Sequence, residues 1–272
     1  MTGGDTTLRF IEDMMTKAGI HAREATAGRP PFVEMSGICK TFGHVQALQG
    51  VDFSLYDAEV VGLVGDNGAG KSTLIKIISG AYRPDAGTIR VDGQPVTFHS
   101  PRDAMHMGIA TVYQNLALVD QRDVASNIFL GRELVRGLVL DRSRMLEESV
   151  QVLQMLRSDI PSVEVSVGFL SGGQRQAVAI ARAIHQSAAR MVIMDEPVAA
   201  LGIEESRKVL RLIQRLKDQG HGVIVISHNL EHVFSVADRI VVLRRGRLVG
   251  VRRKAETNAA EIVRLIVGAE HL

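Results

Sequence analysis

The chain has 272 residues, of which 46% are apolar and 23% charged, with no tryptophan and 3 tyrosines. This length is sufficient for a buried core and for one large domain or two modest ones. The 32 basic and 30 acidic residues leave a net charge of +2, which excludes a general attraction to nucleic acid or acidic lipid.

Cysteine usage and hydropathy indicate a protein of a reducing compartment. The single cysteine, Cys39, excludes an intrachain disulfide bond. No apolar run approaches the ~18 residues that a membrane helix requires, and residues 1–17 carry acids where a secretory signal would be apolar. We therefore expect a cytosolic protein, and any membrane span in its assembly must come from other chains.

Residues 1–30 are predicted to form an N-terminal extension before a domain that covers residues 31–272. The segment Gly28-Arg29-Pro30-Pro31 disfavours regular structure and marks the boundary. Whether the extension is a surface helix or a disordered tail stays open. The spacing of one amphipathic helix that ends at Gly19 is carried by Leu8, Ile11, Met14, Met15 and Ala18.

The next segment has the pattern of a β region that leads into a glycine-rich turn. Residues 32–56 alternate apolar and polar side chains, as in an antiparallel sheet. The short apolar run 60–64 then precedes the turn, and a helix is predicted from Lys71 to Ser79. Two further strands are expected at 88–91 and 95–98.

The glycine-rich turn matches a phosphate-binding loop in the context where that motif has a mechanism. Its glycines allow backbone angles that a β-carbon would forbid, so successive N–H groups can point at an anion. The helix N-terminus adds partial positive charge, the lysine reaches the β and γ oxygens of a nucleoside triphosphate, and the serine hydroxyl binds Mg²⁺. The loop consists of Gly65, Asp66, Asn67, Gly68, Ala69, Gly70, Lys71, Ser72 and Thr73.

The second half of the chain alternates helical patterns with short apolar strands. Residues 126–158 have a helical pattern, and a second helix is expected to start after Gly173 and run through Ile184. Strands are predicted at 191–194 and 223–226, with a helix between them that ends at Gly220. The apolar stripe of the first helical segment is predicted to comprise Leu146, Val150, Leu153 and Leu156.

This alternation implies right-handed crossovers and a mostly parallel sheet. The predicted fold class is therefore α/β, with a phosphate-loop NTPase core, an antiparallel β subdomain and a helical subdomain at about 115–185. A final helix is expected after Asn258, because a cap residue followed three positions later by Glu261 is typical of a helix start. No internal repeat is visible, so we expect one nucleotide cassette.

Two adjacent carboxylates follow the strand at 191–194. Ligands bind at the carboxyl ends of parallel strands, so Asp195 and Glu196 are expected at the ligand-binding edge of the sheet. Asp195 suits a role in holding Mg²⁺, and Glu196 can take a proton from the water that attacks the γ-phosphate. The pair is thus a candidate for hydrolysis of the bound nucleotide.

The segment Leu170-Ser171-Gly172-Gly173-Gln174 provides a second anion site at a helix start. A hydroxyl, free backbone amides and the helix dipole come together there. Two phosphate sites about 100 residues apart either contact different parts of one nucleotide or serve nucleotides in two chains.

With these motifs, the chain resembles the ATP-binding cassette family of transport ATPases over residues ~32 to 250. In that family the signature sequence of one subunit closes on the γ-phosphate held by the phosphate loop of the other. The resemblance implies that Ser171 and Gly173 act in trans across a head-to-tail dimer that sandwiches two ATP. Gly172 and Gln174 complete that nucleotide-binding segment.

Three further residues match functional positions of the family. The resemblance implies that Phe42 stacks on adenine, that Gln114 touches Mg²⁺ and links the cassette to its membrane partner, and that His228 contacts the γ-phosphate. Two residues depart from the usual pattern. Val198 replaces a Ser or Thr, which puts one hydrogen bond of that loop in doubt, and Gly202 replaces an Asp. Gly at position 202 occurs in the carbohydrate-importer branch and is mild evidence for it.

Several segments resemble the bacterial monosaccharide importers that serve ribose, xylose and fructose, in the single-cassette, fructose-type form: 65–68, 117–118, 127–133 and 227–234. A single cassette implies a homodimer. The short segment after residue 250 leaves no room for the regulatory barrel of other sugar importers.

The resemblance implies an ATP-hydrolysing subunit that powers uptake of a monosaccharide through a separate permease, which docks on residues 114–130. A periplasmic sugar-binding protein and a peripheral position at the cytoplasmic face of the inner membrane are then expected. The alternative is the ATPase subunit of an exporter or of an importer of another substrate. The translation-factor and DNA-repair ATPases of the same fold are excluded, since neither a second cassette nor a long coiled-coil insertion is present.

Overall fold

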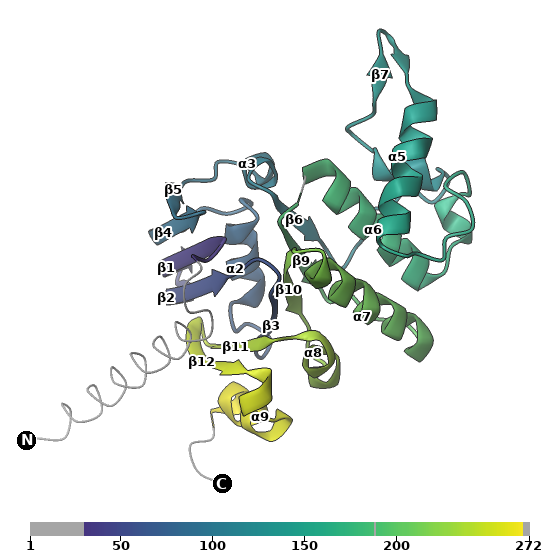
Figure 1. Cartoon of the computed structure of the whole chain (residues 1–272). Coiled ribbons are helices and arrows are strands. Elements are labelled where there is room, and N and C mark those ends of the chain that lie inside the picture. Colours follow the sequence, from purple (N-terminus) through teal and green to yellow (C-terminus); the bar gives the residue numbers. More distant parts are fainter. Residues whose placement is uncertain (1–29, 188, 269–272) are drawn as a thin grey trace, which may run out of the picture.

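The computed structural model describes residues 30–187 and 189–268. Its strands form a four-stranded antiparallel sheet, a six-stranded mostly parallel sheet and a short hairpin, as Figure 1 shows. The helix expected between residues 8 and 18 and the start of the extension lie outside the described residues. None of the helices in the described ranges is long and apolar enough to span a bilayer.

The antiparallel sheet confirms the β region expected for residues 32–56. Its strand order is β2-β1-β4-β5, and Val33 pairs with Leu55 at one end of the first hairpin. The strands expected near 88–91 and 95–98 correspond to β4 and β5, which pair with each other on the side of β1 opposite β2. The bounds are β1 (Val33–Phe42), β2 (Val45–Leu55), β4 (Ala86–Val91) and β5 (Gln94–Val96).

The main sheet has the order β12-β11-β3-β10-β9-β6, with every neighbouring pair parallel except β11 and β12. The mostly parallel sheet predicted from the sequence is therefore confirmed. Its strands are β3 (Val60–Val64), β6 (Ile109–Val112), β9 (Met191–Asp195), β10 (Gly222–Ile226), β11 (Arg239–Arg244) and β12 (Arg247–Arg253).

The central strands are apolar throughout because both faces of the sheet are covered. Val61 and Leu63 point into the cluster formed with α2 and the antiparallel sheet, whereas Val60 and Val64 point into the cluster formed with α6 and α7. The helices around the sheet are α2 (Lys71–Ile78), α3 (Pro101–His106), α6 (Gly172–Ser187), α7 (Ile203–Asp218), α8 (Leu230–Val236) and α9 (Ala259–Val267).

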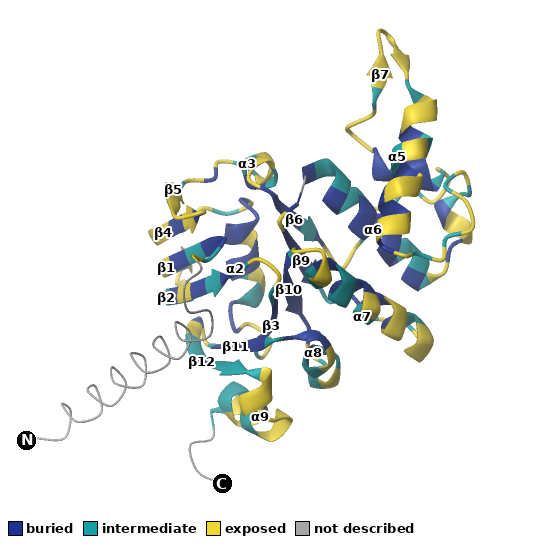
Figure 2. Cartoon of the chain, in the orientation of Figure 1, coloured by how far each residue is buried: buried dark blue, intermediate teal, exposed yellow. Residues whose placement is uncertain are grey.

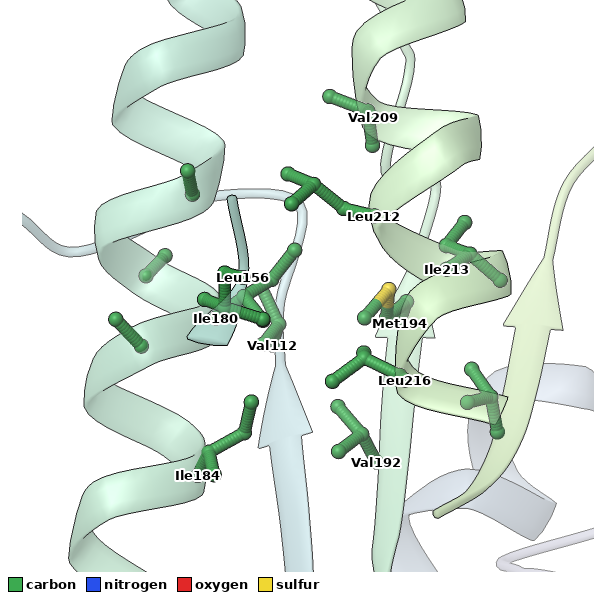
Figure 3. Close-up of a cluster of buried hydrophobic side chains, with 14 of the residues drawn as sticks. Val112, Leu156, Ile180, Ile184, Val192, Met194, Val209, Leu212, Ile213 and Leu216 are labelled. Carbon is green, nitrogen blue, oxygen red and sulfur yellow. The ribbon is translucent and has the colours of Figure 1, made fainter. Parts of the chain in front are cut away.

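The second cluster is shown in Figure 3, where side chains of α6 and α7 meet those of β9. Ile180 and Ile184 come from α6, and Leu212 and Leu216 come from α7. On β3, Gly62 leaves room for α8, because a β-carbon there would collide with Val233. The sheet and its helices are thus packed without space for a larger residue at that point.

The segment 126–158 is not helical throughout, which corrects the sequence prediction. A hairpin of two short strands separates α4 (Val124–Ile128) from α5 (Arg142–Met155). Figure 2 shows this hairpin as an exposed projection beyond α5. Its strands are β7 (Val135–Arg136) and β8 (Val139–Leu140); single-turn helices occur at Val167–Phe169 and Lys254–Glu256.

The other helices that the sequence predicted lie where they were expected, α3 and α8 were not predicted, and one side-chain assignment is wrong. Asn258 caps α9 by accepting from the Glu261 backbone amide, as expected. On α5, Val150 is 38% exposed and does not belong to the buried stripe. Met145 and Ser149 are buried there instead.

The interface between α7 and the sheet yields a stability prediction. Leu216→Ala should lower the free energy of unfolding by about 2–5 kcal/mol, because a fully buried leucine leaves a cavity when truncated. Leu138→Ala, in the exposed hairpin, should change it by less than about 0.5 kcal/mol. Urea unfolding of both variants measures the difference, and equal losses would contradict this assignment of the core.

Candidate functional site

Four parallel strands end at one edge of the main sheet and place the candidate residues next to one another. Ile226 on β10 pairs in register with Leu63 on β3 and with Asp195 on β9. Val112 on β6 lies beside Met194. The segments that follow these strands therefore meet at the same edge: the phosphate loop after β3, Gln114 after β6, Glu196 after β9 and His228 after β10.

The phosphate loop is held in backbone conformations that need glycine. Gly65, Gly68 and Gly70 have φ values of 151°, 74° and 104°. A β-carbon on Gly65 would collide with the Leu243 carbonyl of β11, and one on Gly70 would lie 2.7 Å from the Ala47 carbonyl oxygen of β2. The loop is thus closely packed between two strands, which leaves its curvature little freedom.

Hydrogen bonds inside the loop fix its shape. The Lys71 ammonium donates to the carbonyl oxygens of Gly65 at 2.6 Å and Asp66 at 3.0 Å. The Asp66 carbonyl also accepts from the Ala69 amide, and its carboxylate accepts from the Asn67 amide at 2.8 Å. The Lys71 side chain therefore spans the loop and connects its end to its beginning.

The first turn of α2 begins at this loop. Ser72 is exposed and Thr73 is half-buried. Burial lowers the pKa of Lys71, while the negative charges of Glu196, Asp66 and Asp195 act in the opposite direction. Two of these charges belong to the carboxylates at the end of β9, which the sequence predicted for the same edge of the sheet as the loop.

Glu196 and His228 are in direct contact. One carboxylate oxygen of Glu196 accepts from the His228 backbone amide at 3.0 Å and lies 2.9 Å from His228 Nδ1. The other accepts from the Ser227 hydroxyl at 3.3 Å. The Glu196 side chain is 17% exposed and that of His228 is 79% exposed, so the histidine faces solvent while it positions a mostly buried carboxylate.

The Glu196 backbone is also unusual, with a φ of 50° in a non-glycine residue. Its amide donates to the Ile226 carbonyl at the end of β10. The chain thereby turns sharply after β9, and this turn directs the Glu196 carboxylate toward Ser227 and His228. Strained positions of this kind are typical of functional sites. Sequence reasoning had missed Ser227, although its position directly before His228 was a usable signal.

Asp195 ends β9 and is half-buried. Burial raises the pKa of Asp195, and the charge of Glu196 adds to the increase, whereas Lys71 and Lys76 oppose it. Within residues 30–187 and 189–268, no three His, Cys, Asp or Glu side chains form a metal-binding group. One carboxylate and the exposed Ser72 hydroxyl nevertheless suit Mg²⁺, which is commonly held by one or two carboxylates together with substrate phosphates and water.

Gln114 and Phe42 lie at the surface. Gln114 is exposed beyond β6 and makes no hydrogen bond with the other candidate residues in the described part of the chain. Phe42 ends β1 with 42% of its surface exposed and meets the Tyr82 ring edge-on at a centroid distance of 5.3 Å. Lys40 Nζ lies 5.5 Å from the Phe42 ring centroid. Tyr82 was not singled out in the sequence, where nothing marked it.

The segment 171–174 packs at the start of α6 beside the residues that begin α7. Ser171 and Gln174 form a capping box: the Ser171 amide donates to the Gln174 side chain at 3.0 Å, and the Gln174 amide donates to the Ser171 hydroxyl at 3.4 Å. A β-carbon on Gly172 would meet the side chain of Leu201, just before α7, and one on Gly173 would lie against Glu205 in the first turn of α7. Among the described residues, no hydrogen bond joins this segment to residues 65–73.

The two departures in the loop after Glu196 have local explanations. Val198 is buried and packs in the cluster that contains α6 and α7, so its apolar side chain has a core role. Gly202 is the N-cap of α7 without a side-chain cap, and its carbonyl accepts from the Ser206 amide at 2.9 Å. The loop therefore keeps a helix start without the carboxylate usual at position 202.

A family model described as ABC transporter matches residues 48–199, more than half of the chain. The chain belongs to the ABC transporter family. It is 49% identical to the xylose/arabinose import ATP-binding protein XylG of Sulfolobus acidocaldarius, over 86% of this chain and 93% of that protein. It is 45% identical to the fructose import ATP-binding protein FrcA of Rhizobium meliloti, over 88% of this chain and 95% of that protein.

Other relatives are about twice as long as this family member. The ribose import ATP-binding protein RbsA of Yersinia pestis is 42% identical over 88% of this chain, which spans 46% of that protein. Among solved structures, MJ1267, an ATP-binding cassette of an ABC transporter, superposes with a TM-score of 0.77 at 26% identity, covering 87% of this chain and 99% of that one. The α/β cassette fold expected from the sequence is therefore confirmed.

The raised pKa of Asp195 gives a prediction for stability against pH. In the folded protein the ionised form is disfavoured, so the cost of ionisation is absent below the unfolded pKa of about 3.9 and is fully present above the folded pKa. Asp195→Asn removes this cost, and it should raise the melting temperature at about pH 7.5. The gain should shrink as the pH falls toward about 4.

Thermal melting of the nucleotide-free protein across this pH range measures the effect. Glu147→Gln, an exposed change on α5, serves as the matched control and should show no such pH-dependent gain. An Asp195→Asn protein that is no more stable than the unmodified chain at the higher pH would contradict the electrostatic description of the site.

Proposed function

We propose that this chain is the ATP-hydrolysing subunit of an ABC importer, coupling ATP binding and hydrolysis to uptake of a monosaccharide through a separate permease. The observation that carries the proposal is the contact between Glu196 and His228 at the sheet edge where the phosphate loop begins. The relatives support the substrate class, since they are named as import proteins for xylose/arabinose, fructose and ribose.

In the proposed site, the amides of the phosphate loop and Lys71 bind the β and γ phosphates. Ser72, Asp195 and Gln114 hold Mg²⁺, which neutralises charge on the phosphate oxygens. Phe42 is exposed enough to stack on the adenine ring. Apart from Phe42, the residues given these roles end or follow the parallel strands whose register brings them to one edge of the sheet.

Glu196 is proposed as the general base for hydrolysis. Its carboxylate accepts a proton from the attacking water, and three donors from Ser227 and His228 hold it in place. The exposed imidazole of His228 is then free to contact the γ-phosphate with its other nitrogen. The histidine would thus link the base to the phosphate being cleaved.

A second copy of the chain is proposed to complete each site. Within one chain, the segment at the start of α6 packs beside the residues that begin α7 and, among the described residues, makes no hydrogen bond to the phosphate loop; it comprises Ser171, Gly172, Gly173 and Gln174. Both segments are anion sites at helix starts, so one nucleotide can engage both when two copies meet head to tail. ATP is thereby enclosed between two protomers.

The membrane partners are part of the same proposal. Residues 114–130 would dock the permease, and a periplasmic sugar-binding protein would deliver the substrate to it. The chain would then be a peripheral subunit at the cytoplasmic face of the inner membrane. We also propose the division into an extension at 1–30 and a nucleotide-binding domain at 31–272, with a helical subdomain at about 115–185.

The proposed base gives a direct test. Glu196→Gln keeps the shape and a hydrogen-bond acceptor but cannot take a proton, so ATP turnover should fall by about 10²–10⁴-fold while ATP still binds. Phosphate release measures turnover, and size-exclusion chromatography with light scattering should detect an ATP-dependent dimer of this variant.

Glu204→Gln is the control, because that side chain is 74% exposed and pairs only with Arg207 among the described residues. Its turnover should match the unmodified protein. Unchanged turnover in Glu196→Gln would remove Glu196 from the role of base. Failure of ATP to bring two copies together when hydrolysis is blocked would argue against the shared site.

A further inference from the structure

A pocket of about 200 Å³ lies between α7 and the residues that follow α5. It is separate from the phosphate loop and reaches Gly173 at the start of α6. Most of its polar lining is cationic, with a single carboxylate. The charged and hydroxyl side chains that line it are Arg157, Ser158, Asp159, Lys208, Arg211 and Arg215.

The cations of α7 share one helix face. Lys208, Arg211 and Arg215 are spaced three and four residues apart, which aligns them on the side that faces the pocket. Lys208 pairs with Asp159 at 2.5 Å, and Arg215 donates to the carbonyl oxygens of Leu156 and Arg157 at 2.7 and 3.0 Å. These two side chains hold the end of α5 against α7.

Arg157 and Arg211 differ from Lys208 and Arg215 in having no partner within the described part of the chain. Neither guanidinium makes a hydrogen bond or ion pair with any residue in the described ranges, although both line the pocket. The pocket therefore has more positive charge than its own Asp159 can balance. Guanidinium groups bind phosphate oxygens through pairs of parallel hydrogen bonds, so two unpaired guanidiniums suit an oxyanion with several acceptor atoms.

The backbone at Arg157 strengthens this interpretation. Its φ is 49°, and its amide and that of Ser158 donate to the Gln154 and Leu153 carbonyls, which is the capped helix end that usually has glycine in this position. An arginine occupies it here, at a conformational cost that glycine would avoid. The side chain retained at this cost is one that lines the pocket.

Ser158 adds an independent observation. Its hydroxyl oxygen is buried and has no hydrogen-bond partner among the described residues. Buried polar groups in folded proteins are nearly always paired, so an unpaired hydroxyl requires an explanation. The residue lines the pocket, and rotation of its side chain would bring the hydroxyl to an oxyanion bound there.

We propose that this pocket binds a phosphate monoester, with Arg157 and Arg211 as the principal ligands of the phosphate group and Ser158 as a further donor once its side chain rotates toward the pocket. The space of about 200 Å³ is many times what a single water molecule needs, which leaves room for a small organic group attached to the phosphate. The ligand class is a small phosphorylated metabolite. The assignment does not depend on the function proposed above.

Isothermal titration calorimetry of the full chain with two probes tests the proposal: inorganic phosphate and glucose 6-phosphate, each at about 0.15 M ionic strength, where weak surface attraction is screened. We expect saturable binding of one ligand per chain. Similar affinity for both probes would show that the phosphate group alone is recognised. Tighter binding of glucose 6-phosphate would show that the organic part contributes, and both results support the pocket.

Substitutions of the pocket arginines test whether the probes bind in this pocket. Arg157→Gln and Arg211→Gln should each weaken binding by about tenfold or more, because each removes a charge-assisted pair of hydrogen bonds. Arg207→Gln removes an exposed cation of α7 that does not line the pocket, and it should leave the affinity unchanged within about twofold. Melting temperatures of all three variants verify that they are folded.

Lys71→Ala separates the pocket from the phosphate loop. Binding that survives Lys71→Ala and is lost in the two pocket variants supports the proposal. Binding that is lost in Lys71→Ala and kept in Arg157→Gln and Arg211→Gln would overturn it, because the probes would then occupy the phosphate loop. Absence of saturable binding of either probe would overturn it as well.

Discussion

The parallel register of four strands is the constraint on which the candidate site depends. Because β3, β10, β9 and β6 run in the same direction and end at the same level, the residues that follow them must meet. Backbone hydrogen bonds between neighbouring strands thus join the phosphate loop to Glu196 and His228, which are far away in the sequence. No disulfide bond takes part, since the chain has a single cysteine.

The same constraint concentrates charge in a partly buried place. Burial disfavours the charged forms of both Lys71 and Asp195, so it lowers the pKa of the first and raises that of the second. Their mutual attraction and the hydrogen bonds of Lys71 to the loop carbonyls offset part of this cost. An arrangement that is unfavourable for folding but specific in geometry is what a binding site for a charged ligand requires.

The sequence was most informative where one physical rule dominated. Short apolar runs between turns identified the central strands, and the glycine spacing identified the loop at 65–73, because few other structures satisfy those patterns. The hairpin at 135–140 was missed, since its apolar residues also fit the helical pattern around it. Gly131 and Gly137, with φ values of 78° and 69°, show in retrospect where that helix had to stop.

Other details depend on contacts that are not encoded locally. Ser149 is buried on α5 because its hydroxyl donates to the Met145 carbonyl at 2.7 Å, which satisfies a polar group inside the core. Periodicity placed Val150 there instead. Likewise, the sequence brought Glu196 and His228 to one edge but could not predict their hydrogen bonds, which depend on the left-handed turn at Glu196.

The lack of a side chain at Gly62, inside the sheet, affects the position of residues at the surface. Helix α8 rests directly on this position through Val233, and α8 begins immediately after the Ser227–His228 turn. A methyl group at position 62 would collide with a γ-carbon of Val233, so the valine side chain or the helix would have to move, and a displaced helix would carry the preceding residues, His228 among them, with it. The absence of a side chain at the buried Gly62 therefore helps to fix the position of the exposed His228 side chain.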